Sequence, residues 1–185
     1  VVHKNILFTV RDVELPIFRL QRLRAGSQPG AVTDCKDILL GLYDLEMEYS
    51  ADALEDAYAD LDLLSRRVLT RQHLSDAEAK KILLEIPHCE DVNSRIRRNV
   101  LDTQRALSFL QRGKFLSAEQ REDCEKISRD IESIDNHTSF IFGKINFLMD
   151  TTAGFVNVNQ NERVNRLTYA SVALMVVSLL LGLGA

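Results

Sequence analysis

The sequence of 185 residues contains no tryptophan, only three prolines and eight glycines, and three widely separated cysteines. Because proline and glycine mark turns, a chain with so few of them has few turns, which favours long helices over a many-stranded sandwich or barrel. An odd number of distant cysteines predicts neither a disulfide framework nor a Cys-x-x-Cys metal site, and fits a reducing compartment. The composition therefore predicts a mainly α-helical protein with free thiols.

The charge is also modest, with 23 Lys and Arg against 27 Asp and Glu and a net charge of −4. The sequence has no short run of Lys and Arg, so a nucleic-acid partner is not expected. It has no HExxH zinc motif, no GxxxxGK[ST] phosphate loop and no GxSxG nucleophile motif. These absences predict that the protein is not an enzyme and has no organic cofactor.

One long stretch at the end of the chain, residues 167–185, carries no charge at all. At about 1.5 Å per residue, a helix of this length spans the ~30 Å hydrocarbon core of a bilayer. Arg163 and Arg166 precede it, and the positive-inside rule then places residues 1–166 in the cytoplasm. We predict a transmembrane helix here; the alternative is a buried core helix.

Short elements are expected at the amino-terminal end. Residues 4–11 alternate as a strand with Ile6, Phe8 and Val10 on one face, and residues 15–23 form a short helix. A single strand is not a stable sheet, so its partners are absent or come from elsewhere. We assign residues 1–30 to the end of an α/β domain.

Capping signals delimit two long helices in the middle of the chain, a helical region that we place at residues 31–116. The first helix begins at Thr33 or Asp34. A capping box at Ser75 opens the second, which Pro87 is expected to kink or interrupt.

A third long helix begins at the capping box of Ser117 and has a regular heptad pattern. Residues at alternating steps of three and four form a seam over four heptads, which predicts a coiled coil. The seam comprises Cys124, Ile127, Ile131, Ile134, Thr138, Ile141, Ile145, Leu148, Thr152 and Phe155. Cys124 is therefore interpreted as a packed core residue. We assign residues 117–166 to a stalk helix that continues into residues 167–185.

A second heptad series, the polar stripe, runs from the stalk into the apolar span. It comprises Asn161, Val164, Thr168, Ser171, Met175, Ser178 and Gly182, and its steps continue to Ala185. Polar groups on one stripe of a membrane helix face neighbouring helices or a water-filled path. The stripe predicts either close helix packing, with hydroxyls bonded back to the backbone, or a pore formed by several copies.

Asparagines recur every four residues just before the span, at Asn157, Asn161 and Asn165. A neutral amide oxygen can bind the hydration water of a cation without holding the ion as tightly as a carboxylate would. Mg²⁺ gives up its water reluctantly, so this arrangement suits a hydrated Mg²⁺ ion. The alternative is an ordinary polar segment beside the membrane.

An acidic tract between Asp44 and Asp62 contains no Lys or Arg. Its members are Asp44, Glu46, Glu48, Asp52, Glu55, Asp56, Asp60 and Asp62. Such a tract is either a solvated helix face or a surface that collects cations.

Residues 127–175 resemble the stalk and first membrane helix of the CorA family of divalent-cation transporters. The most specific segments are RDIES, HTSF, KINFLMD and GFVNVNQNE. Residues 37–69 resemble the family's first long cytoplasmic helix. The resemblance implies a mainly α fold in which long helices form a coiled-coil-like stalk that continues into a transmembrane helix, with a remnant of an N-terminal α/β domain.

The resemblance also implies a homopentameric channel in the inner (plasma) membrane that carries Mg²⁺, and also Co²⁺ and Ni²⁺. Its implied partners are further copies of the chain, membrane lipid and divalent cations, with Mg²⁺ both transported and regulatory. The matching pore positions are Asn161, Val164, Leu167, Thr168, Met175, Ser178 and Gly182. Asp130 is the candidate ligand of a regulatory Mg²⁺ that holds the channel shut, and Asn161 the candidate contact of the hydrated ion.

The family's Gly-Met-Asn signature, its second membrane helix and most of its N-terminal domain are absent from the sequence. We therefore expect these 185 residues to be a fragment that does not conduct by itself. Two alternatives remain. One is a non-transporting, tail-anchored helical scaffold that uses the seam over residues 127–155 to bind a partner, and the other is a zinc transporter of the same superfamily.

Overall fold

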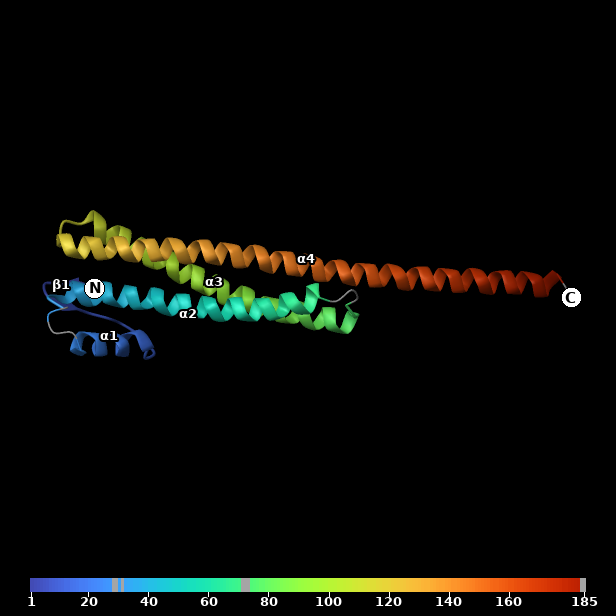
Figure 1. Ribbon diagram of the computed structural model, residues 1–185, viewed down its shortest axis with the longest axis horizontal. Coiled ribbons are helices and arrows are strands. Elements are labelled where there is room, and N and C mark those ends of the chain that lie inside the picture. Colours follow the sequence, from blue (N-terminus) through green and yellow to red (C-terminus); the bar gives the residue numbers. More distant parts are fainter. Residues whose placement is uncertain (28–29, 31, 71–73, 184–185) are drawn as a thin grey trace. The chain divides into compact units, whose positions relative to one another are not determined.

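The computed structural model describes residues 1–27, 30, 32–70 and 74–183 (Figure 1). The described elements are β1 (Val2–His3), β2 (Ile6–Leu7), α1 (Pro16–Ser27), α2 (Cys35–Leu69), α3 (Asp76–Arg112) and α4 (Ala118–Leu183). The predicted mainly α-helical fold class is confirmed.

The strand predicted over residues 4–11 is wrong in its extent. Only Ile6–Leu7 is a strand, and it pairs antiparallel with Val2–His3 of the same chain. The chain turns back at Lys4, which has a φ of 53°, and the Asn5 side chain accepts a hydrogen bond from the Cys35 backbone N–H at 3.0 Å. This contact with the first residue of α2 fixes a turn where alternation alone predicts extended backbone.

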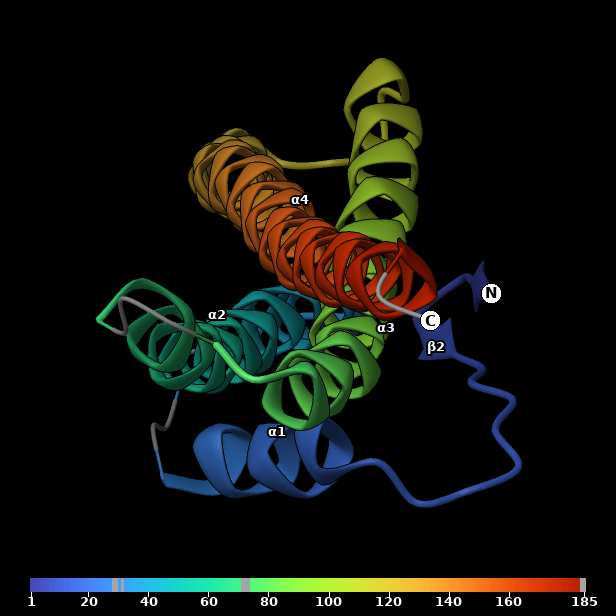
Figure 2. The same ribbon diagram turned by 90° about the vertical axis from the view of Figure 1, so that its right-hand side faces the viewer.

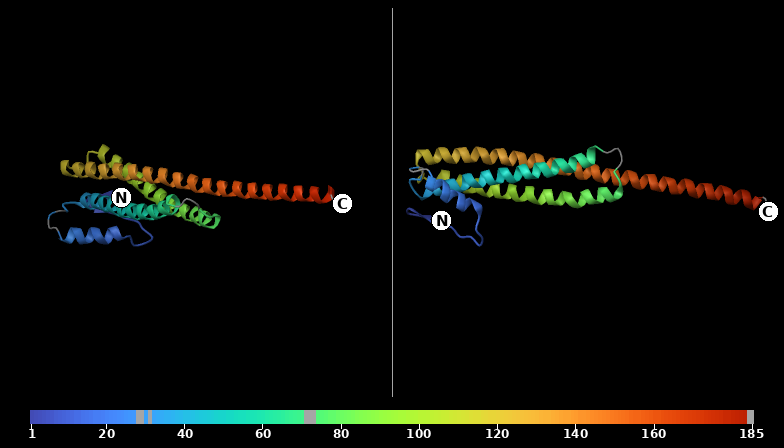
Figure 3. Two further views of the ribbon diagram at one scale, coloured as in Figure 1. Left: turned by 45° about the vertical axis from the view of Figure 1, so that its right-hand side comes forward. Right: turned by 60° about the horizontal axis from the view of Figure 1, so that its bottom comes forward.

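Helix α1 lies beside the first part of α2 (Figure 3). A small apolar cluster joins them, made by Ile17, Leu42 and Leu45 with Leu7, Phe18 and Ile38 packed against it. At Gly41 the two helices approach closely, because a Cβ there would lie 2.4 Å from the Gln21 side-chain nitrogen. The lack of a side chain at Gly41 therefore allows the buried Gln21 amide to rest on α2.

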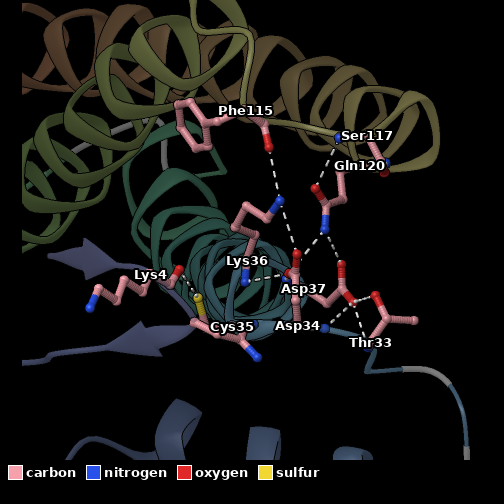
Figure 4. Close-up of polar contacts among 10 residues, drawn as sticks. Lys4, Thr33, Asp34, Cys35, Lys36, Asp37, Phe115, Ser117 and Gln120 are labelled. Atoms are coloured by element: carbon pink, nitrogen blue, oxygen red, sulfur yellow. Dashed lines mark hydrogen bonds and ion pairs between the residues drawn. The ribbon is translucent and has the colours of Figure 1, made fainter.

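Hydrogen bonds tie the start of α2 to the start of α4 (Figure 4). Asp34 caps α2 as predicted, since its Oδ1 accepts from the backbone N–H of Lys36 at 2.8 Å and of Asp37 at 3.3 Å. The Gln120 amide nitrogen donates to Asp34 at 3.1 Å and to Asp37 at 2.6 Å. The Lys36 ammonium donates to the Phe115 carbonyl at 2.8 Å.

Both predicted capping boxes are confirmed. The Ser75 hydroxyl accepts from the backbone N–H of Glu78 at 3.3 Å, and the Ser75 N–H donates to the Glu78 carboxylate at 3.3 Å. Ser117 and Gln120 make the same two contacts at 3.1 Å each. Each box satisfies backbone donors that the first turn of a helix leaves without partners.

Helix α3 passes through Pro87 without an interruption. A proline inside a helix removes one backbone hydrogen bond. Its neighbours Ile86 and Cys89 are 2% and 5% exposed, so packing of this turn offsets that loss.

The chain forms two compact units. The first comprises residues 1–60 and 90–143, and in it α2, α3 and α4 lie side by side (Figure 2). The second comprises residues 61–89 and 144–185. The seam is buried in both units. Its members between Cys124 and Ile141 lie in the first unit and those between Ile145 and Thr152 in the second, and each of these seam residues is at most 6% exposed. The last member, Phe155, is half-buried. The seam is therefore covered by the chain's own helices.

A polar layer crosses the first unit. The buried Asn93 of α3 donates a hydrogen bond to the Thr138 carbonyl of α4 at 3.0 Å. The Tyr58 hydroxyl of α2 lies 3.0 Å from the His137 Nδ1. These contacts connect all three long helices at one level.

Candidate functional site

The second unit contains the apolar end of α4. Among the residues that the structure describes, α4 is the one helix long and apolar enough to cross a bilayer. Its apolar stretch is not buried in the chain. A helix in the core of the described residues would be covered, so this observation favours the transmembrane prediction over the core-helix alternative.

The candidate pore residues lie on this uncovered part of α4. Those with described surroundings are all exposed: Asn161, Val164, Leu167, Thr168, Met175 and Ser178. Gly182 belongs to α4, but its surroundings lie outside the described part of the chain. At about 100° per residue, the polar stripe occupies about 100° of the helix circumference, turned away from the buried seam; Leu167 lies at its margin.

Two hydroxyls of the polar stripe bond back to the helix backbone. Thr168 Oγ1 donates to the Val164 carbonyl at 2.9 Å, and Ser178 Oγ donates to the Leu174 carbonyl at 2.8 Å. This is the arrangement expected for simple helix packing. It also leaves the hydroxyl oxygens as acceptors, and the water molecules around a cation present their hydrogens outward. The contacts are therefore compatible with either interpretation of the stripe.

The asparagines before the span fall into two groups. Asn157, Asn161 and Asn165 are exposed, so their amide oxygens are accessible. Asn159 is half-buried, and its amide nitrogen donates to the Leu74 carbonyl at 2.7 Å and to Asp76 at 2.8 Å. Our sequence analysis missed Asn159, although it follows Thr152 by seven residues and so continues the seam.

Most of the acidic tract is a solvated face, as its first interpretation predicts. The six members from Glu48 onward are exposed, while Asp44 and Glu46 are half-buried. Glu46 accepts a hydrogen bond from the Asn99 side chain, and Asp62 pairs with Lys144. Part of the tract is therefore already engaged, by a neutral donor of α3 and by a cation of α4.

Asp44 of the acidic tract lies among charges of both signs. It pairs with Arg24 at 3.3 Å. Burial and the neighbouring Glu48 nevertheless raise its pKa, and the charges of Asp130 and Asp123 act in the same direction. The candidate regulatory residue Asp130 is exposed, and its charge acts on Asp44.

A complete metal site is not formed by one copy. Within the described residues, no group of three or more His, Cys, Asp or Glu side chains could hold a metal ion. Asp123 and Asp130 each act on Asp44 through their charge, but the three do not form such a group. A cation bound there would need ligands from another source.

A family model described as "CorA-like Mg2+ transporter protein" matches residues 1–183. The chain belongs to this CorA-like family. The magnesium transport protein CorA of Haemophilus influenzae is 39% identical over 173 residues, which cover 94% of the chain and 54% of that protein. The proteins of the same name from Salmonella typhimurium and Escherichia coli are 40% identical over 169 residues, which cover 91% and 53%.

The resemblance seen in the sequence is confirmed by these matches. The description of the family is that of a Mg²⁺ transporter, a class of protein that moves ions and is not an enzyme. The chain spans about half the length of the curated relatives that it matches.

Proposed function

We propose that this CorA-like chain is part of a divalent-cation channel, chiefly for Mg²⁺, that also admits Co²⁺ and Ni²⁺. The observation that carries the proposal is the polar stripe on the uncovered face of α4, which begins at Asn161 and continues into the apolar span. The names of its relatives, magnesium transport proteins, agree with this substrate.

The pore is made by several copies, because one helix cannot enclose a water-filled path. We propose a homopentamer in the inner (plasma) membrane in which the polar stripes face a common axis. Buried inside each chain, the seam is not available for this contact. Val164, Leu167, Met175 and Gly182 then line the path between the polar positions.

Asn161 is proposed to contact the hydrated ion at the cytoplasmic end of the path. Five neutral amides accept hydrogen bonds from the water around Mg²⁺, which lets the ion pass without losing its hydration shell. Thr168 and Ser178 continue this role, because their hydroxyl hydrogens are held by backbone carbonyls and their oxygens face outward.

Asp130 is proposed to help sense cytoplasmic Mg²⁺. Its charge already raises the pKa of Asp44, so bringing further carboxylates near it at a contact between copies costs free energy unless a cation is bound. Bound Mg²⁺ would hold neighbouring copies together and keep the channel shut, and loss of Mg²⁺ would let them repel one another.

The scaffold alternative is weakened by the same burial. It requires the seam over residues 127–155 to bind a partner, yet eight of those nine seam residues are buried in the chain. The zinc alternative gains no support from the described residues, which offer no group of three His, Cys, Asp or Glu ligands.

The mass of the full-length protein in detergent, with and without millimolar Mg²⁺, tests the assembly. We expect five copies, with a change of shape or tightness when Mg²⁺ is added. A monomer or dimer that ignores Mg²⁺ would contradict the channel.

Ion flux into liposomes tests the pore. Asn161→Asp places a ring of carboxylates at the cytoplasmic end of the path, so we expect Mg²⁺ to bind more tightly and pass about tenfold more slowly. Glu162→Gln changes the charge by one unit about 100° around the helix, on the side away from the polar stripe, and is the control. Equal flux in the two variants would remove Asn161 from the path, and competition by Zn²⁺ stronger than by Co²⁺ would favour the zinc alternative.

A further inference from the structure

We infer that Asp76, the first residue of α3, is a positioning residue that fixes which way Asn161 faces. It acts through two residues of α4, Asn159 and Arg163, and we call these three side chains the latch. The inference deepens the proposed function and rests on it, because a fixed direction for Asn161 matters only if Asn161 lines a path.

The two carboxylate oxygens of Asp76 bind different residues of α4. Oδ1 accepts a hydrogen bond from the Asn159 amide nitrogen at 2.8 Å, and Oδ2 lies 2.5 Å from the Arg163 guanidinium. The Asn159 nitrogen also donates to the Leu74 carbonyl at 2.7 Å. Both N–H groups of Asn159 are therefore used, and one carboxylate spans a full turn of α4.

The α3 side of the latch is held firmly in place. The Leu74 side chain is 2% exposed, and the capping box between Ser75 and Glu78 fixes the first turn of α3. Asp76 lies in that first turn, where the helix dipole favours a negative charge. The acceptors that hold α4 thus belong to a fixed point.

Helical geometry connects the latch to the polar stripe. Asn159 and Arg163 are four residues apart and lie on one side of α4. Asn161 is midway between them in sequence, about 200° around the helix from Asn159, and so lies on the opposite side. Holding Asn159 and Arg163 against α3 therefore directs Asn161 away from α3, and rotating α4 would break the latch.

The latch differs from an ordinary surface ion pair. Arg166 and Glu162, one turn further along α4, are 3.7 Å apart with side chains 82% and 46% exposed. Such a pair contributes little to stability. Asp76 is 32% exposed and is held by an amide in addition to a cation, which restricts its position as well as its charge.

Replacing the Asn159 amide by a carboxylate is the substitution expected to disrupt the latch most strongly. Asn159→Asp keeps the size of the side chain but replaces both N–H donors by acceptors that face Asp76. Asp76→Asn is a milder second variant that keeps the shape and removes the charge. Arg163→Lys keeps the cation, and Glu162→Gln removes a charge next to the latch while breaking the exposed ion pair with Arg166.

The experiment uses the full-length protein in liposomes and reads two quantities. The first is the rate at which a cysteine introduced by Asn161→Cys reacts with a charged thiol reagent; the native Cys35, Cys89 and Cys124 are buried. The second is the maximal Mg²⁺ flux of the same latch variants with Asn161 intact. Assembly mass confirms that each variant folds.

We expect Asn159→Asp and Asp76→Asn each to change the labelling rate at position 161 and the maximal flux by about fivefold, with unchanged assembly mass. Arg163→Lys and Glu162→Gln should stay within about twofold. A merely structural contact would alter stability without altering the direction of Asn161. An unchanged labelling rate in both latch variants, or an equal change in Glu162→Gln, would overturn the inference.

The two proposals fail in different ways. If labelling changes in the latch variants while Asn161→Cys itself conducts normally, the latch holds α4 but Asn161 is not in a path, and the proposed function is wrong. If Asn161→Cys reduces flux while the latch variants label normally, the path stands and the latch is refuted.

Discussion

Asn93 uses only part of its hydrogen-bonding capacity. Its side chain is 2% exposed and donates to the Thr138 carbonyl, while its Oδ1 is buried without a partner among the residues that the structure describes. A buried amide with an unmet acceptor costs free energy. It also selects one alignment of α3 against α4, because sliding by a turn would leave the whole amide without a partner.

Two substitutions of Asn93 test this account. Asn93→Leu removes both the hydrogen bond and the unmet acceptor, so we expect stability to change by about 1 kcal/mol or less. Asn93→Asp buries a charge with no counter-ion bonded to it and should destabilise the protein by about 3 kcal/mol or more. Melting temperatures in detergent at pH 7 compare them, and equal values for the two variants would contradict this account.

Single residues differ in how far the sequence predicts them. Heptad spacing predicts that Thr138 and Cys124 lie in the core, and both are buried. Burial raises the pKa of the Cys124 thiol, as expected for a packed residue, and the charges of the neighbouring Asp123 and Glu125 act in the same direction. Asn93 and Asp76 give no such signal. Their roles depend on which turn of α3 meets α4, and that is decided by packing between segments far apart in sequence.

At the level of elements, local chemistry decides where helices begin. Asp34, Ser75 and Ser117 each satisfy backbone N–H groups within a few residues, so the sequence predicts all three starts. The strand predicted at residues 4–11 fails because Asn5 bonds to Cys35, thirty residues away. Alternation within a short window carries no information about such a contact.

The join between α2 and α4 should depend on Gln120. Burial alone would raise the pKa of Asp37, but hydrogen bonds from Gln120 and Thr33 outweigh it and hold the pKa below its usual value. A carboxylate of this kind stabilises the fold above its unfolded pKa, about 3.9, and loses that contribution as the pH falls through its lower folded pKa.

Gln120→Leu removes the donor to both Asp34 and Asp37. We expect a loss of about 2 kcal/mol or more at pH 7. The difference from the native protein should shrink below about pH 4, where Asp37 becomes protonated in the variant first. Thermal unfolding between pH 3 and pH 7 measures this, and a difference that does not depend on pH would argue against the Asp37 contact.

For the whole molecule, Asp130 links charge in the first unit to the proposed control by Mg²⁺. Asp130→Asn removes a carboxylate whose charge raises the pKa of Asp44. We expect protection of the full-length protein from protease to require several times more Mg²⁺. Glu132→Gln, an exposed acid on another side of α4, is the control. Unchanged Mg²⁺ dependence in Asp130→Asn would remove it from sensing.

The seam also has a consequence for synthesis. Helix α3 leaves the ribosome with its apolar face uncovered, and the seam of α4 that packs on it is complete at Thr152, about 40 residues after α3 ends at Arg112. At about 5–20 residues per second, that interval lasts about 2–8 s. The apolar stretch that we propose to span the membrane follows the seam, so the order of the chain places the residues that cover α3 ahead of the segment that would enter the bilayer.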